Sequence, residues 1–168
     1  IINALLEIAK AESGTVSKQD HIRIDEMIFD VADELQHIHP DFLFSIEYEA
    51  EKEHELTLPA NAGLLRSAFV NLMQNAVAYS NDNMAGIKFT NVKNAIRISI
   101  ENRGKIITEK EHQYLFQHFV RGENSKGKRG FGLGLVLVHK IIALHNGTVT
   151  YKSRNNSSNI FTITLPLS

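Results

Sequence analysis

Three glycines at alternate positions, Gly130, Gly132 and Gly134, precede an apolar run in "SKGKRGFGLGLVLVHK" (125–140). An interior glycine costs a helix about 1 kcal/mol relative to alanine, so this spacing is not that of an ordinary helix. Free N–H groups and the helix dipole favour an anion at a helix N-terminus, and glycines let the backbone approach it closely. We therefore predict a helix that begins near Leu133 and binds an anionic ligand at its N-terminus.

The segment before these glycines is basic. The stretch "RGENSKGKRG" (121–130) carries four cations against the single acid Glu123, whereas the whole chain has a formal net charge of −1. A local excess of positive charge attracts an anionic ligand, and the alternative is a solvated charge run. The nearly neutral total argues against a general nucleic-acid binder, so no nucleic-acid partner is expected.

Asn71 and Asn75 are four residues apart in a predicted helix and project at nearly the same angle, at the rim of its apolar stripe. Amide oxygens on one rim can coordinate a hard cation. Mg²⁺ bound together with phosphates takes only one or two protein ligands and keeps several waters. The pattern indicates a magnesium site, and two surface asparagines remain the alternative.

Hydrophobic periodicity predicts the elements that must position these residues. Helices are expected at 1–13, 25–35, 60–79, 108–119 and 133–145, and the fourth begins with a capping box of Thr108 and Glu111. Strands are expected at 22–24, 42–50, 54–59 (stopped by Pro59), on both sides of an Asn-containing turn within 86–102, and as a hairpin at 147–153 and 159–166. The mixed order, without regular βαβ repeats, predicts an α+β fold: a two-layer sandwich of a mixed sheet with helices on one face.

The composition narrows the chemistry further. With 168 residues and 43% hydrophobic content, the chain can bury one main core. It has no cysteine, which excludes disulfides, zinc sites of Cys type and thiol catalysis, and which fits a reducing compartment. No apolar run approaches the roughly 20 residues of a membrane helix. The chain begins within a helical pattern, so we expect a piece of a longer protein with any membrane anchor or sensor upstream.

Several short stretches occur in a fitting order along the chain: "NLMQNAVAYS" (71–80), "LFQHFVRG" (115–122), "GFGLGL" (130–135), "HNGTVTYKS" (145–153) and "FTITLP" (161–166). Together they resemble the ATP-binding domain of sensor histidine kinases, within the wider ATPase superfamily of gyrase, chaperone and histidine-kinase type. The first looks like that family's asparagine box, the second its phenylalanine box and the third its second glycine box. The resemblance implies a Bergerat-type ATP-binding fold.

The stretch "LLEIAKAESG" (5–14) resembles the end of the second dimerisation helix of histidine kinases, which other members of the superfamily lack. We therefore expect residues 1–14 to end that helix and residues 15–168 to form the catalytic domain. The resemblance places the phosphoacceptor histidine upstream of residue 1. The fragment is thus not expected to autophosphorylate alone, and its eight histidines are expected to be surface or packing residues.

The resemblance also implies the residues of a Mg²⁺-ATP site. Asn71 and Asn75 are the expected catalytic residues, and Asn75 is the expected metal ligand. The cations of 121–129 lie in a segment that looks like a lid over the nucleotide. The full set of expected nucleotide-binding residues is Asn71, Asn75, Tyr79, Asn102, Gly104, Ile107, Phe119, Arg121, Lys126, Lys128, Arg129, Gly130, Gly132, Leu133, Gly134 and Leu135.

The chain departs from the family's pattern at three positions. The first glycine box, normally Asp-x-Gly-x-Gly, reads "NRGKI" (102–106), with Asn102 in place of the aspartate and Ile106 in place of the second glycine. Asn102 can still accept a hydrogen bond from the adenine amino group, but without charge assistance, at a loss of about 1 kcal/mol. Ile106 does not tolerate a left-handed backbone, and Ala78 replaces a common lysine. We expect weakened or retuned nucleotide binding, not its loss.

The leading hypothesis is the catalytic half of a two-component sensor histidine kinase, a cytoplasmic domain of a membrane-anchored sensor. Its expected partners are ATP or ADP, its own dimerisation domain in a homodimer, and the receiver domain of a response regulator. Asn102 and Ile106 leave open a degenerate, non-catalytic module that binds nucleotide or partners. A serine kinase acting on an anti-sigma partner is a third reading, and the stretch 5–14 counts against it.

Overall fold

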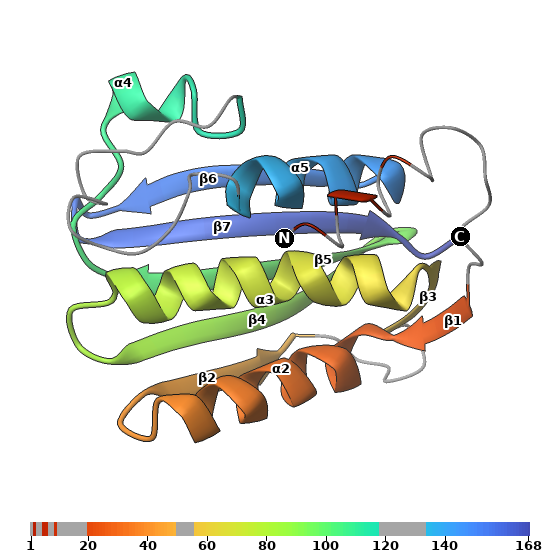
Figure 1. Cartoon of the computed structure of the whole chain (residues 1–168), viewed down its shortest axis with the longest axis horizontal. Coiled ribbons are helices and arrows are strands. Elements are labelled where there is room, and N and C mark those ends of the chain that lie inside the picture. Colours follow the sequence, from red (N-terminus) through yellow and green to blue (C-terminus); the bar gives the residue numbers. More distant parts are fainter. Residues whose placement is uncertain (1, 3–4, 7–8, 10–19, 50–55, 118–133) are drawn as a thin grey trace.

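The computed structural model describes residues 2, 5–6, 9, 20–49, 56–117 and 134–168 (Figure 1). Its main sheet has five strands in the spatial order β2 (Leu43–Tyr48), β4 (Met84–Val92), β5 (Ala95–Arg103), β7 (Ser158–Pro166) and β6 (Thr148–Arg154). β2 pairs with β4 in parallel and the other neighbours are antiparallel, so the sheet is mixed. A second, two-stranded antiparallel sheet joins β1 (Asp20–Arg23) to β3 (Thr57–Ala60).

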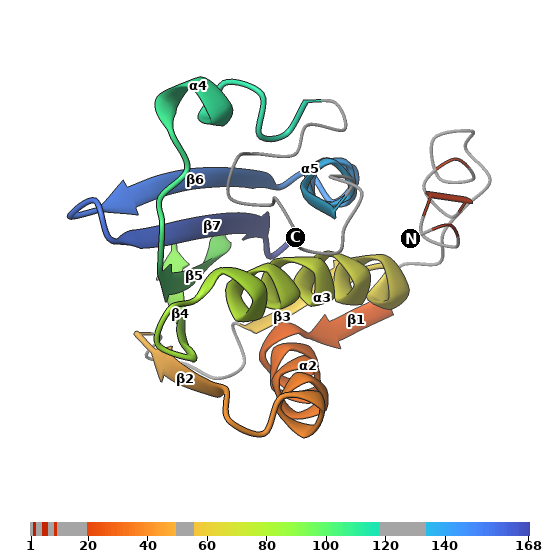
Figure 2. The same ribbon diagram turned by 60° about the vertical axis from the view of Figure 1, so that its left-hand side comes forward.

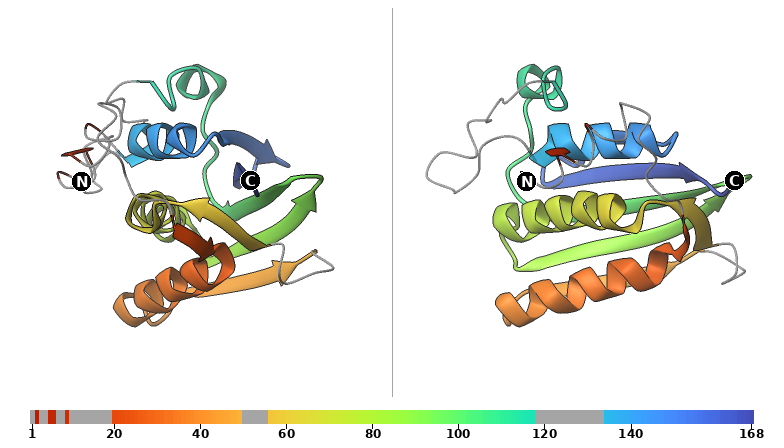
Figure 3. Two further views of the ribbon diagram at one scale, coloured as in Figure 1. Left: turned by 90° about the vertical axis from the view of Figure 1, so that its right-hand side faces the viewer. Right: turned by 45° about the vertical axis from the view of Figure 1, so that its right-hand side comes forward.

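Three helices, α2 (Ile24–Ile38), α3 (Ala62–Tyr79) and α5 (Gly134–Leu144), lie on one side of the five-stranded sheet (Figures 2 and 3). The short helix α4 (Glu109–His112) stands apart from these three, beyond β6 (Figure 1). The predicted α+β sandwich, a mixed sheet with helices on one face, is therefore confirmed.

The core lies between the helices and the inward face of the sheet. In β4 and β5, buried and exposed positions alternate, as expected of strands with one face on a core and one in solvent. Phe69 and Met73 of α3 meet this face, where Phe89, Ile98 and Ile163 are fully buried. Each such side chain contributes about 1.5–3 kcal/mol through burial. The core thus fixes α3 and α5 as a rigid layer above the sheet.

The beginning of α3 is fastened to the end of α5. Asn61 caps α3, because its side-chain oxygen accepts a hydrogen bond from the Leu64 N–H at 2.9 Å. The backbone N–H of Asn61 donates to Nε2 of His145 at 3.0 Å, and Nδ1 of His145 lies 2.7 Å from the Ile141 carbonyl oxygen. Nε2 is therefore the acceptor and Nδ1–H the donor of a neutral imidazole. Burial lowers the pKa of His145, and the hydrogen bond to Ile141 opposes this effect.

Two predicted boundaries near the small sheet are wrong. Pro59 does not end its strand: it lies within β3, opposite His21, and the strand continues to Ala60. Proline is tolerated there because a two-stranded sheet consists only of edge strands, in which an N–H directed away from the partner is not needed. Accordingly, α3 begins at Ala62, not at Ala60.

The other differences concern helix lengths. Ile24 was expected in a strand but is the first residue of α2, which continues past Leu35 to Ile38. The capping box of Thr108 and Glu111 is confirmed, yet α4 spans only Glu109–His112, and residues 113–116 form turns. A cap satisfies the N–H groups of a first turn, but no residue of α4 is buried, so little apolar packing extends the helix.

The predicted hairpins agree with the structure. Lys93 and Asn94 form the turn between β4 and β5, with Lys93 at a positive φ of 53°. β6 and β7 form the closing hairpin, in which Asn155 and Asn156 take φ values of 50° and 52°.

Of the predicted helix at 1–13, the structure describes Ile2, Leu5, Leu6 and Ala9, all helical, and the rest lies outside the described residues. The side chains of Ile2, Leu5 and Leu6 are exposed. Within the described ranges, no helix combines the length and apolar character needed to cross a membrane.

Candidate functional site

Three of the expected site residues form a row on α3. Asn71, Asn75 and Tyr79 are spaced by four residues, so they share one face of the helix over about 12 Å of its axis. All three are half-buried. The predicted location of the asparagines at the rim of the apolar stripe is therefore correct, and the row connects the start of α5 with the end of β5.

At one end of the row, Asn71 meets the N-terminus of α5. The Nδ2 group of Asn71 donates to the Ser67 carbonyl oxygen at 2.8 Å, which orients its Oδ1. A Cβ atom added to Gly134 would lie only 2.9 Å from this Oδ1, closer than real Cβ contacts allow. Gly134 therefore lets the beginning of α5 approach Asn71. The asparagine box and the second glycine box meet here, and Leu135 packs partly buried against the core.

Asn75 lies in the middle of the row, one helical turn from Asn71. Its side chain makes no hydrogen bond to any group in the described part of the chain, although it is only partly exposed. Within the described residues, its amide oxygen is thus open to a ligand. An arrangement of one or two amide oxygens with additional phosphate and water ligands fits Mg²⁺.

At the other end of the row, Asn102 lies at the end of β5, between Ala85 of β4 and Asn159 of β7. It is buried, with 5% of its surface exposed. Its Nδ2 donates to the Arg103 carbonyl oxygen at 3.3 Å, whereas no described group donates to its Oδ1. This amide oxygen is therefore suited to an N–H donor of a ligand.

Gly104 allows the end of β5 to approach α3. A Cβ atom at this position would overlap the carbonyl oxygen of Tyr79, the last residue of α3. The Asn81 N–H also donates to the Arg103 carbonyl oxygen at 2.9 Å. Glycine is required at 104 because of this close backbone approach, which brings Tyr79, Asn102 and Gly104 together.

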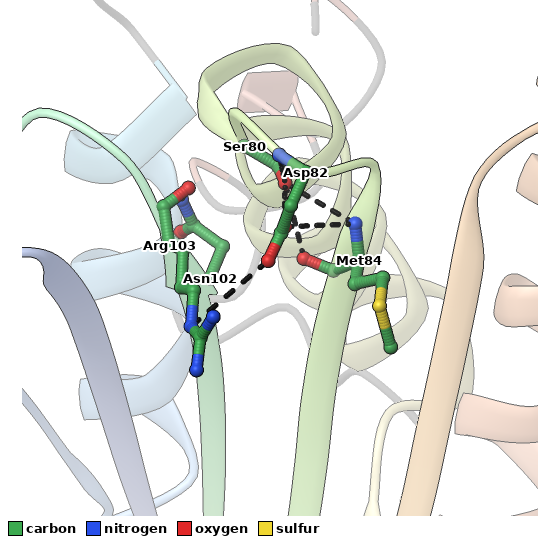
Figure 4. Close-up of polar contacts among 5 residues, drawn as sticks. All are labelled: Ser80, Asp82, Met84, Asn102 and Arg103. Atoms are coloured by element: carbon green, nitrogen blue, oxygen red, sulfur yellow. Dashed lines mark hydrogen bonds and ion pairs between the residues drawn. The ribbon is translucent and has the colours of Figure 1, made fainter.

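The loop after α3 is braced by polar contacts (Figure 4). The Ser80 hydroxyl donates to the Asp82 carboxylate at 2.9 Å. The Met84 N–H donates to Ser80 Oγ and to Asp82 Oδ1, each at 3.2 Å. The Arg103 guanidinium, at the end of β5, faces Asp82 with a separation of 4.0 Å. These contacts hold the loop against the strand that carries Asn102.

The segment after Gly104 takes a backbone conformation that isoleucine tolerates. Ile106 is not among the non-glycine residues with positive φ. The next residue, Ile107, is partly buried, and its N–H donates to the Tyr151 hydroxyl at 2.9 Å. Sequence reasoning did not single out Tyr151 or its partner Asn159. The sequence signal that could have identified them was a tyrosine at an inward-facing position of one predicted strand and an asparagine in the next.

Half of the expected site residues lie outside the described part of the chain. These are Phe119, Arg121, Lys126, Lys128, Arg129, Gly130, Gly132 and Leu133. Their assignments stay predictions. The described half comprises Asn71, Asn75, Tyr79, Asn102, Gly104, Ile107, Gly134 and Leu135.

A family model described as histidine kinase-, DNA gyrase B- and HSP90-like ATPase matches residues 60–168. The chain belongs to this ATPase family. The match includes α3, β5 and α5, which carry the site described above.

Similar proteins are sensor histidine kinases. Sensor histidine kinase HprS of Escherichia coli (strain K12) is 32% identical over 165 residues, which cover 96% of this chain and 35% of HprS. Heme sensor protein HssS of Staphylococcus haemolyticus is 29% identical over 164 residues, which cover 96% of this chain and 35% of HssS. The chain therefore spans about a third of the length of these curated relatives. The predicted resemblance to the ATP-binding domain of sensor kinases is confirmed.

Solved structures agree with the fold. The catalytic domain of histidine kinase ThkA superposes with a TM-score of 0.76 at 24% identity, covering 90% of this chain and 97% of that domain. Full-length ShkA in complex with AMPPNP gives a TM-score of 0.76 at 20% identity, covering 99% of this chain and 35% of ShkA.

Proposed function

We propose that this ATP-binding domain transfers the γ-phosphate of Mg²⁺-ATP to a histidine on the dimerisation helices of a sensor kinase. The phosphate then passes to an aspartate in the receiver domain of a response regulator. Residues 1–14 end the second dimerisation helix and residues 15–168 form the catalytic domain. The exposed apolar side chains of Ile2, Leu5 and Leu6 support a dimer contact at this helix.

The observation that carries this proposal is the meeting of Asn71 with Gly134 at the N-terminus of α5. A helix N-terminus favours phosphate, and the absence of a Cβ at Gly134 lets the α5 backbone approach the asparagine row. Asn75 follows one turn later with an available amide oxygen. A helix N-terminus suited to phosphate and amides suited to a metal ion thus lie side by side, which supports a site for a nucleoside triphosphate with its metal ion.

The residues of α3 fit a magnesium ion. Asn75 would coordinate it with its amide oxygen, and Asn71, oriented by its hydrogen bond to Ser67, would provide a second oxygen nearby. When bound, Mg²⁺ neutralises charge on the phosphate oxygens.

At the opposite end of the row, the chain binds the base. Asn102 accepts a hydrogen bond from the adenine amino group through its unused oxygen, and Tyr79 and Gly104 border the same space. Because phosphoryl transfer depends mainly on positioning and charge neutralisation, no side chain of this chain has to act as a covalent intermediate. The acceptor histidine comes from the dimerisation helices of the longer protein, a membrane-anchored sensor whose kinase domain is cytoplasmic.

Isothermal calorimetry of the 168-residue chain tests the nucleotide site. ATP and ADP should bind more tightly with Mg²⁺ than with EDTA, because the metal links the phosphates to Asn75. Binding that is insensitive to EDTA would contradict the metal assignment, and no heat at millimolar nucleotide would contradict the site as a whole.

A degenerate module that binds nucleotide without turnover is the second candidate. Asn102 and Ile106, which depart from the family's pattern, favour it. The two candidates differ in phosphotransfer, which can be measured with radiolabelled ATP in the longer protein that includes the dimerisation helices. Label on a histidine supports the kinase, whereas nucleotide binding without label supports the module.

A further inference from the structure

Two buried polar side chains outside the expected site lie beneath the segment that follows Gly104. Tyr151 of β6 and Asn159 of β7 have 5% and 4% of their surfaces exposed. They belong to the closing hairpin, about 45 residues or more along the chain from the segment that they contact. Burying hydroxyl and amide groups costs free energy unless they are hydrogen-bonded, so the hydrogen-bond partners of this pair must be identified.

The pair forms a continuous chain of hydrogen bonds to the backbone of residues 105–107. The Ile107 N–H donates to the Tyr151 hydroxyl at 2.9 Å, and this hydroxyl donates to Oδ1 of Asn159 at 2.8 Å. Nδ2 of Asn159 in turn donates to the Lys105 carbonyl oxygen at 3.2 Å. Both backbone groups that flank Ile106 are therefore held by one two-residue unit.

Two further contacts bind the same stretch to the hairpin. The Gly104 N–H donates to the Ser157 carbonyl oxygen at 2.9 Å, in the turn between β6 and β7. The ring of His112, in α4, meets the Tyr151 ring edge-on with centroids 5.2 Å apart. The hairpin thus holds the whole connection from the end of β5 to α4.

We propose that Tyr151 and Asn159 are positioning residues for the base-binding end of the nucleotide site. They hold residues 105–107 in place, and through them Gly104 and the end of β5 where Asn102 faces the adenine. The inference rests on the proposed nucleotide site. It also explains how the connection stays ordered with Ile106 in place of a glycine, because tertiary hydrogen bonds fix its backbone.

Tyr151→Phe tests the proposal, since it removes the hydroxyl and keeps the ring that packs on Phe161 and His112. We expect affinity for adenosine and for ADP to fall by the same factor, about 3- to 10-fold, because the two lost hydrogen bonds act on the base only through residues 105–107. The ratio of ADP affinities with and without Mg²⁺ should stay unchanged, because the expected metal ligand, Asn75, lies on α3, outside this chain of hydrogen bonds. Amide hydrogen exchange at Ile107 should accelerate.

Ser99→Ala is the matched control. It removes the hydroxyl that pairs with Thr162 at 3.2 Å between β5 and β7, in the same sheet but away from residues 105–107. It should leave adenosine affinity and Ile107 exchange as in the wild type. Asn159→Asp keeps the acceptor for Tyr151 and loses the donor to Lys105, so it should weaken adenosine binding without removing the buried side chain. The double variant with Tyr151→Phe should lose less than the product of the two single effects, because both residues belong to one network.

The outcomes separate this inference from the proposed function. If the wild type binds nucleotide and Tyr151→Phe binds adenosine equally well, the positioning role is wrong and the nucleotide site stands. A loss confined to the Mg²⁺-dependent part of ADP binding would also overturn it. If the wild type binds neither ADP nor adenosine, the proposed function fails and this inference fails with it.

Discussion

The two ends of the proposed nucleotide site are built in different ways. At the metal end, Asn71 and Asn75 lie on one continuous helix, so their relation follows from a spacing of four residues. At the base end, Asn102 and Gly104 are held by contacts from the loop after α3 and from the β6–β7 hairpin. Asn71 and Asn75 at the metal end follow the family's pattern, whereas Asn102 and Ile106 at the base end depart from it. Substitutions at the base end can thus be compensated by contacts from neighbouring elements, whereas the metal end depends on the two amides that α3 itself carries.

This comparison predicts its largest effect at Asn75. Asn75→Ala should reduce Mg²⁺-dependent phosphotransfer in the longer protein. Loss of a residue that only supports a metal ligand lowers activity about 10–100-fold, and loss of the ligand itself should lower it at least as much. Thermal stability should change little, because alanine is the better helix former and the side chain has no described hydrogen bond to lose. Gln74→Ala, at the exposed neighbouring position, is the control and should keep activity. Activity that survives Asn75→Ala would show that Asn75 is not the metal ligand.

The next effect concerns the close approach at Gly104. Gly104→Ala places a Cβ on the Tyr79 carbonyl oxygen, a backbone atom that cannot rotate away. We expect a destabilisation of about 3 kcal/mol, measured by urea unfolding, together with weaker adenosine binding. Gly86→Ala is the control, since a Cβ there meets nothing within 4 Å, and it should be neutral or slightly stabilising in its strand. Equal stability of the two variants would mean that β5 and α3 are not in this contact.

A third prediction concerns the hydrogen bond between Asn102 and the purine base. Asn102→Asp should keep or strengthen ATP binding by supplying an ionised acceptor, and Asn102→Leu should weaken it by about 1–3 kcal/mol. GTP presents a carbonyl oxygen at the corresponding position. A carboxylate repels this oxygen, whereas a rotated amide can donate an N–H to it. The wild type should therefore separate ATP from GTP less sharply than Asn102→Asp. Calorimetric titration of both nucleotides gives the ranking, and equal ATP affinities in all three proteins would mean that Asn102 does not touch the base.

The smallest expected effect is a pH dependence at the α3–α5 junction. Burial lowers the pKa of His145 from its ordinary value of 6.5, and the neutral ring accepts the Asn61 N–H. The unfolded chain therefore binds this proton more readily than the folded one. The contribution of His145 to stability is complete above pH 6.5 and is lost as the pH falls from 6.5 towards the lowered pKa.

This contribution can be isolated by urea unfolding between pH 8 and pH 5. The wild type should lose about 1 kcal/mol more than His145→Gln, the value of one hydrogen bond. Parallel profiles for the two proteins would contradict the role of His145. Adenosine binding should depend on this residue less than Mg²⁺-dependent binding does, if the two ends of the site are held independently.

Much of the fold could be predicted from hydrophobic periodicity, because the buried positions of α3 recur with the period of a helix and those of β4 and β5 with the period of a strand. The boundaries that were wrong involve long-range or packing effects. Pro59 stays in a strand because β1 pairs with it, and α4 stops after one turn because none of its residues is buried. No local rule covers either case.

The sequence by itself determined the α+β architecture, the spacing of Asn71 and Asn75 on α3 and the position of α5 after the glycine pattern, because helical spacing and glycine patterns are local. Tertiary structure alone decided that Gly104 lies against Tyr79, that His145 fastens α5 to α3, and that Tyr151 and Asn159 hold residues 105–107. These contacts join residues 25 to 84 positions apart, and their partners are set only when the helices and the sheet pack together.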